Sequence, residues 1–153
     1  MNQVFTWLVD SPWSRALASA EWVFPIVQSL HFIGFALLIG TIAVVDLRLL
    51  GLAMLKQQPD KLDSELSAWK WAGLAFVLTT GFVMFSGSAT AYHHNAAFRF
   101  KMTCLTLALL FHFTLHRRAI RSGVSPVTAR LAAVASLVLW TAVVFGGRMI
   151  AFV

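Results

Sequence analysis

One stretch of this sequence restricts the fold more than any other, because it runs from Trp22 to Val45 without Asp, Glu, Lys or Arg. An α-helix needs about 20 apolar residues to cross the hydrocarbon core of a bilayer. A second such run extends from Trp71 to Tyr92, and two further apolar segments, about 98–116 and 129–152, are interrupted by charge. Hydrophobic residues make up 59% of the chain and charged residues 12%, more apolar side chain than one small water-soluble core can bury. We therefore expect an integral membrane protein.

The predicted fold class is all-α: an integral membrane four-helix bundle with a short N-terminal interfacial helix. The whole chain, 1–153, is expected to form a single transmembrane domain. The helices are predicted at about 22–50, 69–92, 97–118 and 127–152. The interfacial segment is predicted at about 2–20, where aromatic and polar residues alternate as in helices that lie in the membrane surface. This segment lacks the basic leader of a cleavable signal peptide.

Basic residues are divided unequally between the two ends of the predicted bundle. One end is expected to hold Arg48, Lys56, Lys61, Lys70, Arg117, Arg118, Arg121 and Arg130. The other end is expected to hold Arg15, Arg99, Lys101 and Arg148. The positive-inside rule places the more basic end in the cytoplasm. We predict a multi-pass protein of the bacterial inner (plasma) membrane with both termini periplasmic, and we attribute its net charge of +6 to this orientation and not to nucleic-acid binding.

Two cations are expected within the membrane near the periplasmic end. Only 15 residues separate Lys101 from Arg117, which gives about 22 Å of helix against about 30 Å of hydrocarbon. In the last helix, 17 apolar or small residues precede Arg148. Snorkelling towards the headgroups accounts for either cation alone. Together they indicate an anion from outside the chain, since the acidic residues expected on that side are Asp10 and Glu21.

An intramembrane imidazole is expected close to these cations. His31 lies about nine residues into the first helix, which is about 13 Å below its periplasmic end. On the third helix, Lys101, Cys104, Ala108 and His112 share one face. Side chains on facing helices hold cofactors and metals in the cores of helix bundles. An axial imidazole in particular suits haem iron.

Haem b would account for both the imidazole and the cations. Its two carboxylates need cationic partners, for which Lys101 and Arg148 are available. The second axial ligand stays open, because His112 lies about 9 Å deeper than His31 at helical rise, His94 lies nearer the surface, and Lys101 is a third candidate. We predict His31 and His112 as metal ligands, with Lys101, Arg148 and His94 as further cofactor-binding residues.

The cytoplasmic end carries two further groups of interest. Asp46 and Arg48 are two residues apart and point to different faces of the helix, so they do not pair. We expect Asp46 to contact a basic residue of the loop between the third and fourth helices, as part of assembly. His116, beside Arg117 and Arg118, is expected at the membrane interface.

Several of these segments carry a family resemblance. "QSLHFIGFALLIGTIAVVDLRLLG", the helix bearing Lys101, His112 and His116, and the closing "GGRMIAFV" resemble a family of small four-helix bacterial membrane proteins, a domain of unknown function, from about residue 20 onwards. More distantly, the layout is similar to the bacterial haem-b protoporphyrinogen oxidase family, and this resemblance implies that His31 and Lys101 are haem-site residues. Copper-resistance D-type membrane domains share the four-helix plan, although the methionines of this chain are scattered.

Three functions remain open. The first, which we favour, is a haem-b-binding protein that transfers electrons between a membrane quinol and a redox partner protein. The second is a protoporphyrinogen-oxidase-like membrane enzyme, which would bind an anionic tetrapyrrole at the same cations. The third is a cofactor-free structural or helper subunit of a membrane complex. In each case the surroundings are the lipid bilayer, no nucleic acid is involved, and a homo-oligomer is expected.

Overall fold

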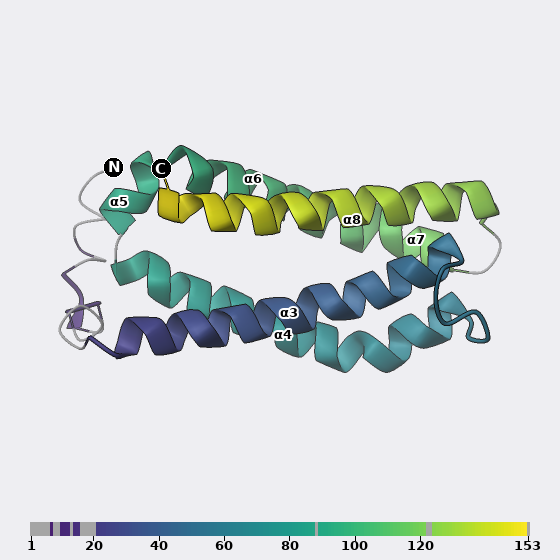
Figure 1. Cartoon of the computed structure of the whole chain (residues 1–153), viewed down its shortest axis with the longest axis horizontal. Coiled ribbons are helices and arrows are strands. Elements are labelled where there is room, and N and C mark those ends of the chain that lie inside the picture. Colours follow the sequence, from purple (N-terminus) through teal and green to yellow (C-terminus); the bar gives the residue numbers. More distant parts are fainter. Residues whose placement is uncertain are drawn as a thin grey trace.

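The computed structural model describes residues 7, 10–12, 14–15, 21–87, 89–121 and 124–152, except for the side chains of residues 90, 91 and 93. Its long helices are α3 (Val23–Leu50), α4 (Pro59–Gly87), α6 (Ala96–Phe111) and α8 (Pro126–Met149) (Figure 1). Its short elements are α5 (Ala89–His94), the π-helix η1 (His112–His116), α7 (Arg117–Ile120) and the 3-10 helix η2 (Ile150–Phe152). The described residues contain no strand.

Four helices are long and apolar enough to cross a membrane. Three of them are α3, α4 and α8, and the fourth combines α6, η1 and α7 into one span, Ala96–Ile120. The predicted all-helical fold, with four helices long and apolar enough to span a membrane, is therefore confirmed. The predicted interfacial segment at about 2–20 lies largely outside the described residues.

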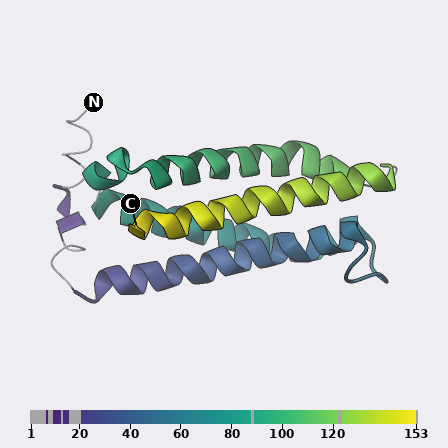
Figure 2. The same ribbon diagram turned by 45° about the horizontal axis from the view of Figure 1, so that its top comes forward.

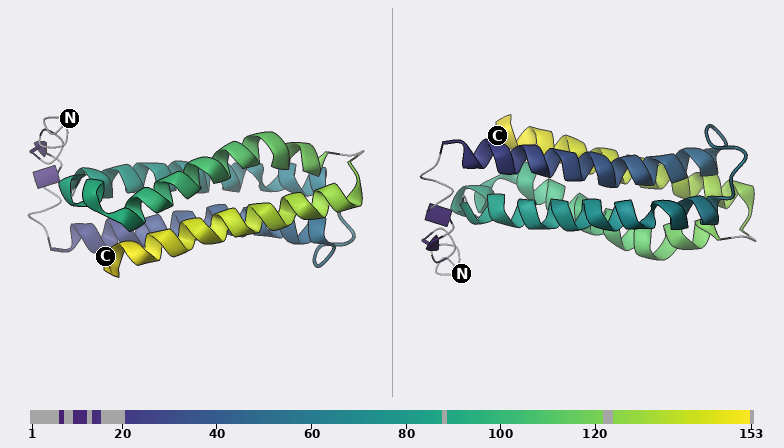
Figure 3. Two further views of the ribbon diagram at one scale, coloured as in Figure 1. Left: turned by 90° about the horizontal axis from the view of Figure 1, so that it is seen from above. Right: turned by 90° about the horizontal axis from the view of Figure 1, so that it is seen from below.

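The helices pack as two pairs. α3 lies along α4, α6 lies along α8, and α3 also contacts α8 (Figure 3). α3 begins and α8 ends at the same end of the bundle, which we call the terminal end (Figures 1 and 2). At the opposite end, called the basic end, α3 and α7 finish and α4 and α8 begin. The basic end carries the residues predicted for it, among them Arg48, Lys61, Arg117, Arg118 and Arg130.

Glycines allow α3 and α4 to approach closely. A Cβ atom on Gly73 would lie 2.8 Å from the backbone nitrogen of Leu38, and one on Gly34 would lie 2.9 Å from the Cβ of Phe76. Small residues at such crossings are the usual basis of helix association in lipid, where the hydrophobic effect does not drive helices together. These two glycines therefore set the α3–α4 distance.

The buried side chains form two successive layers along the bundle. The central layer contains Leu38, Ile42, Leu74, Cys104, Leu105, Ala108, Trp140 and Val143. The layer nearer the basic end contains Val45, Leu49, Leu62, Ile120 and Ala133. Many other large apolar side chains, such as Ile26, Phe32, Phe82 and Leu131, are exposed on the outside of the bundle, as expected for surfaces that face lipid.

The helix ends follow local sequence signals. α3 stops at Gly51, whose φ of 78° is easily adopted by glycine. Asn95 caps α6 by accepting a hydrogen bond from the Phe98 backbone N–H at 3.0 Å, and its amide also donates to the Ile150 carbonyl of η2. α8 opens on a Ser125 cap followed by Pro126, the residue type favoured at a first helical position.

The second helix differs from the predicted range. α4 begins at Pro59 and not at about 69, and it ends at Gly87, with the separate α5 following. Its first turns are polar and include an ion pair between Lys70 and Asp63 at 2.5 Å. A helix that continues beyond the hydrocarbon carries such residues at its end, so hydropathy alone placed the start too late.

Candidate functional site

His31 is a buried polar residue in the half of α3 nearer the terminal end. It retains 8% exposure and points at α4, where its Nδ1 lies 2.8 Å from the hydroxyl oxygen of Thr80. The missing side chain of Gly81 leaves room for the ring, because a Cβ there would lie 3.3 Å from the Cε1 of His31. The imidazole is therefore held against one face of α4.

The bonds of Thr80 fix the tautomer of His31. The Thr80 hydroxyl donates its only proton to the Phe76 carbonyl at 2.6 Å, so its oxygen accepts from His31 and Nδ1 carries the hydrogen. The Val77 carbonyl, a further acceptor for the ring, lies beside the same hydroxyl, 3.4 Å from the Thr80 oxygen. In a neutral imidazole, Nε2 then keeps its lone pair, and the hydrogen bond of the ring to the Thr80 side chain uses Nδ1.

Lys101 of α6 lies close enough to His31 for their charges to interact. Its ammonium group is 5.8 Å from the ring centre of Phe35, and that ring is in turn 5.9 Å from the ring of His31. The Lys101 side chain lies against Gly147, with its Nζ 3.5 Å from where a Cβ would be. Within the described part of the chain, no carboxylate forms an ion pair with Lys101.

The other predicted site residues have different neighbours. The guanidinium of Arg148 lies over the ring of Phe152, 5.1 Å from its centre. His94 is exposed on α5, beyond the end of α4. His112 is buried in η1 and lines a pocket with Leu38 and Ile42 of α3, which follow His31 by two to three helical turns. The structure thus brings His31 and Lys101 together, with Arg148 following Gly147 beside Lys101, and it places His112 in the pocket and His94 on α5.

At the terminal end, an aromatic cluster packs α4, α5 and α6 together. The rings of Phe85, Tyr92 and Phe98 stack on one another, with centroids 5.2 to 6.3 Å apart. Burial in this cluster raises the pKa of the Tyr92 phenol, because the phenolate loses hydration there. Tyr92 of this cluster precedes His94 by two residues.

A second polar centre lies towards the basic end, and the sequence reasoning missed it. Asp46 of α3 accepts a hydrogen bond from the Nε2 of His116 at 2.5 Å, and neither side chain is exposed at all. The expectations that Asp46 contacts a basic loop residue and that His116 sits at the interface are therefore wrong. The two residues are 70 positions apart, and only the packing of α3 against η1 brings them together.

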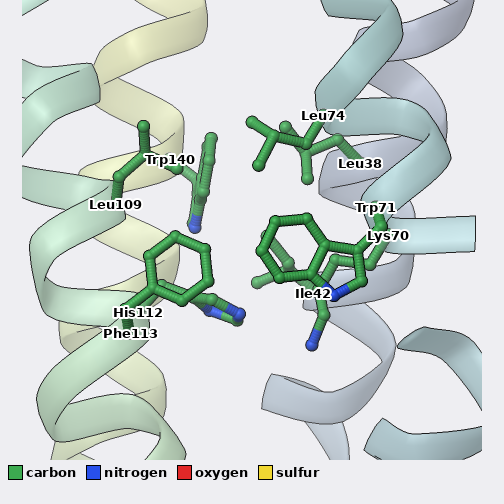
Figure 4. A pocket seen from close by; sticks show the side chains of 9 residues that line it. All are labelled: Leu38, Ile42, Lys70, Trp71, Leu74, Leu109, His112, Phe113 and Trp140. Carbon is green, nitrogen blue, oxygen red and sulfur yellow. The ribbon is translucent and has the colours of Figure 1, made fainter. Parts of the chain in front are cut away.

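A small pocket adjoins this second centre (Figure 4). It is lined by Leu38, Ile42, Lys70, Trp71, Leu74, Leu109, His112, Phe113 and Trp140. Residues of α3 and α4 form one wall and residues of α6, η1 and α8 form the other, with the His112 imidazole reaching between them (Figure 4). The space open to the centre of a water molecule is about 10 Å³, which is about what one water needs. A porphyrin does not fit in this space.

The fold and these two intramembrane centres define the class of the protein: a small, four-span helical membrane protein with ionisable side chains inside the bundle. The chain belongs to a family of unknown function, DUF6644, which matches residues 20–153. This family covers the segments whose sequences resemble a domain of unknown function. No curated protein and no solved structure matches the chain, so neither of the two more distant resemblances, to haem-b oxidases and to copper-resistance domains, is shown.

Proposed function

We propose that this protein binds haem b through His31 and transfers electrons within the membrane. The observation that carries the proposal is the pair formed by His31 and Lys101: a buried imidazole held through Nδ1, beside a cation that forms no ion pair with a carboxylate of the described residues. An ionisable side chain inside a membrane span is costly and is usually retained for function. Here a ligand atom and a positive charge occur together.

The setting of His31 resembles that of an axial ligand. Imidazoles that bind metal through one nitrogen usually donate their other N–H to a protein acceptor, which fixes the tautomer and the ring orientation. Thr80 provides that acceptor on α4, and the absence of a side chain at Gly81 lets the ring pack against the helix. Bound haem b would supply a one-electron redox centre.

Lys101 would bind a carboxylate of the haem. The ammonium of Lys101 lies near the ring of Phe35 and beside Gly147. A cation in such apolar surroundings is stabilised by an anionic partner. His112 is not part of this proposed site, because it lies deeper in the bundle and lines the small pocket. The second axial position is therefore assigned to no residue of the chain.

The distribution of charge supports the location. By the positive-inside rule, the basic end faces the cytoplasm of a bacterial cell and the terminal end faces the periplasm. The predicted interfacial helix would then lie on the periplasmic surface. A haem held by His31 and Lys101, in the half nearer the terminal end, would supply the centre through which electrons pass from a membrane quinol to a redox partner protein.

The visible spectrum of the purified protein tests the proposal. In mild detergent, with haem supplied during expression, we expect a Soret band and, after reduction, the α band of a b-type haem. His31→Ala should abolish both bands, while His94→Ala, which changes an exposed histidine, should leave them unchanged. A wild-type protein that remains colourless after incubation with haemin, or a His31→Ala variant with full absorbance, would reject the assignment.

The same preparation separates the other two functions. A colourless, folded protein would favour a cofactor-free helper subunit. Turnover of protoporphyrinogen that depends on Lys101 would instead favour an oxidase, because the substrate carboxylates would then use the same cation.

A further inference from the structure

The second polar centre contains an unusual group of unpaired atoms. Among the described residues, the buried side-chain nitrogen and oxygen atoms without a hydrogen-bond partner are Asp46 Oδ2, His112 Nδ1, His116 Nδ1 and Ser136 Oγ. Buried polar groups are almost always hydrogen-bonded, and an exception usually marks a bound water or ion. These atoms come from three elements, α3, η1 and α8.

Asp46, His116 and His112 are in contact with one another in series, and Ser136 is placed by its neighbours on α8. His116 is bonded to Asp46, and its ring stacks on that of His112 with centroids 4.9 Å apart. On α8, Ser136 follows Ala133, which packs in the layer nearer the basic end, and precedes Trp140, which packs in the central layer. Ser136 therefore lies between the two layers, as the Asp46–His116 pair does.

Water is the ligand that suits these atoms. No three His, Cys, Asp or Glu side chains of the described residues are grouped as a metal site would require. The hydroxyl of Ser136 and the Nδ1 atoms of His112 and His116 can each donate or accept a hydrogen bond. A buried water typically makes about three hydrogen bonds. A water among these atoms would connect His112 to His116.

The pocket gives this centre a connection towards the basic end. His112 lines it together with Lys70, and Lys70 is paired with Asp63 in the polar first half of α4. The titratable and charged groups that act on His112 are His116 in the same π-helical turn, Lys70 and Asp63 from α4, and Arg117 from α7. A π-helical turn, an element often found at functional sites, positions both histidines.

We propose that Asp46, His116 and His112, together with a water bound among their unpartnered atoms, form a buried proton-transfer site that exchanges a proton with the basic end through the pocket beside Lys70. His112 takes a proton at Nε2, the nitrogen on the pocket side, and releases one from Nδ1 to the bridging water. The water passes a proton to His116 Nδ1, and His116 gives its Nε2 proton to Asp46 Oδ1. Both rings end neutral, and one proton has moved to the carboxylate.

This transfer leaves a signature that static helix packing would not. The proton moves on His116 from Nε2 to Nδ1, so the tautomer of a fully buried ring changes with the pH outside. Solid-state NMR of the protein in lipid nanodiscs, with histidine labelled by the heavy nitrogen isotope, reads this directly. In spectra recorded over a series of pH values, we expect wild-type His116 to change tautomer as the Asp46 carboxylate takes up a proton.

Asp46→Asn should remove the switch, because an amide cannot accept the proton, whereas His94→Gln serves as the control and should keep it. A second variant, His112→Gln, leaves the Asp46–His116 pair intact and should slow many-fold the exchange of the His116 ring proton with heavy water. If Asp46→Asn fails to fold, the exchange measurement on His112→Gln tests the proposal.

A His116 ring with one tautomer at every pH, an unchanged switch in Asp46→Asn, or unaltered exchange in His112→Gln would overturn the proposal. The experiment uses haem-free protein, so its outcome is independent of the function proposed for His31.

Discussion

At the residue scale, two buried histidines of this bundle are given different chemistry by their neighbours. His116 uses Nε2 to bond a carboxylate, so a proton is the group it can exchange. His31 uses Nδ1 to bond a hydroxyl that is itself committed to the Phe76 carbonyl, so Nε2 is left as a ligand. The partner of each ring, and not the histidine itself, decides which reaction is available.

Thr80 is accordingly a positioning residue whose loss should weaken haem binding. Thr80→Val removes the acceptor for the His31 N–H while keeping the shape of the side chain. Loss of such an outer partner typically costs about 10- to 100-fold in metal affinity, and titration of the purified protein with haemin would measure it. The matched control is Thr79→Val, which changes an exposed threonine bonded only to the Ala75 carbonyl. Equal affinities of both variants would contradict the role assigned to Thr80.

The sequence pointed to His31 and Lys101 as candidate site residues, but not to Thr80 or to the pair formed by Asp46 and His116. His31 and Lys101 were found because ionisable residues in apolar runs are visible without any structure. The hydroxyl of Thr80 was not, since threonine commonly bonds its own helix in lipid. Asp46 and His116 looked like residues at helix ends, and their pairing depends on how α3 and η1 are aligned, which the sequence does not specify.

At the scale of elements, the contact between α3 and α4 depends on space left by glycine. The atoms nearest to an added Cβ on Gly73 are backbone atoms of Gly34 and Leu38, at 2.8 to 3.1 Å. Backbone atoms cannot rotate away as a side chain can, so the two helices would have to separate.

Gly73→Ala should therefore destabilise the protein by about 1 to 3 kcal/mol, the usual cost of overpacking. Thermal unfolding in detergent, followed by tryptophan fluorescence, would show the lower midpoint. Gly40→Ala is the matched control, because nothing lies within 4 Å of its added Cβ, and alanine is the better helix former. If the midpoints of the two variants shift equally, close backbone packing is not what holds α3 to α4.

Hydropathy predicted α3, α8 and the combined span of α6, η1 and α7 within a few residues, because their ends coincide with polar or turn-forming residues. It failed at the start of α4, where helical structure continues through charged turns outside the apolar run. It also gave no sign of the π-helical turn at His112–His116, since a local change in hydrogen-bond register leaves composition unchanged.

At the scale of the whole molecule, the two polar centres lie in opposite halves of the bundle. The ligand site proposed at His31 is in the half nearer the terminal end, and the proton site proposed at Asp46 is nearer the basic end. If both proposals hold, electron transfer and proton exchange would take place on different sides of the membrane midplane. The orientation of the chain then decides which compartment supplies the proton.

Cysteine labelling measures that orientation. The single native cysteine, Cys104, is buried and should react little. We expect Phe152→Cys, at an exposed position of the terminal end, to react with a membrane-impermeant maleimide on intact spheroplasts. Gln58→Cys, in the exposed loop before α4 at the basic end, should react only after the membrane is opened, because positively charged loops remain in the cytoplasm. The reverse pattern would place the basic end in the periplasm and would make the periplasm the source of protons for Asp46 and His116.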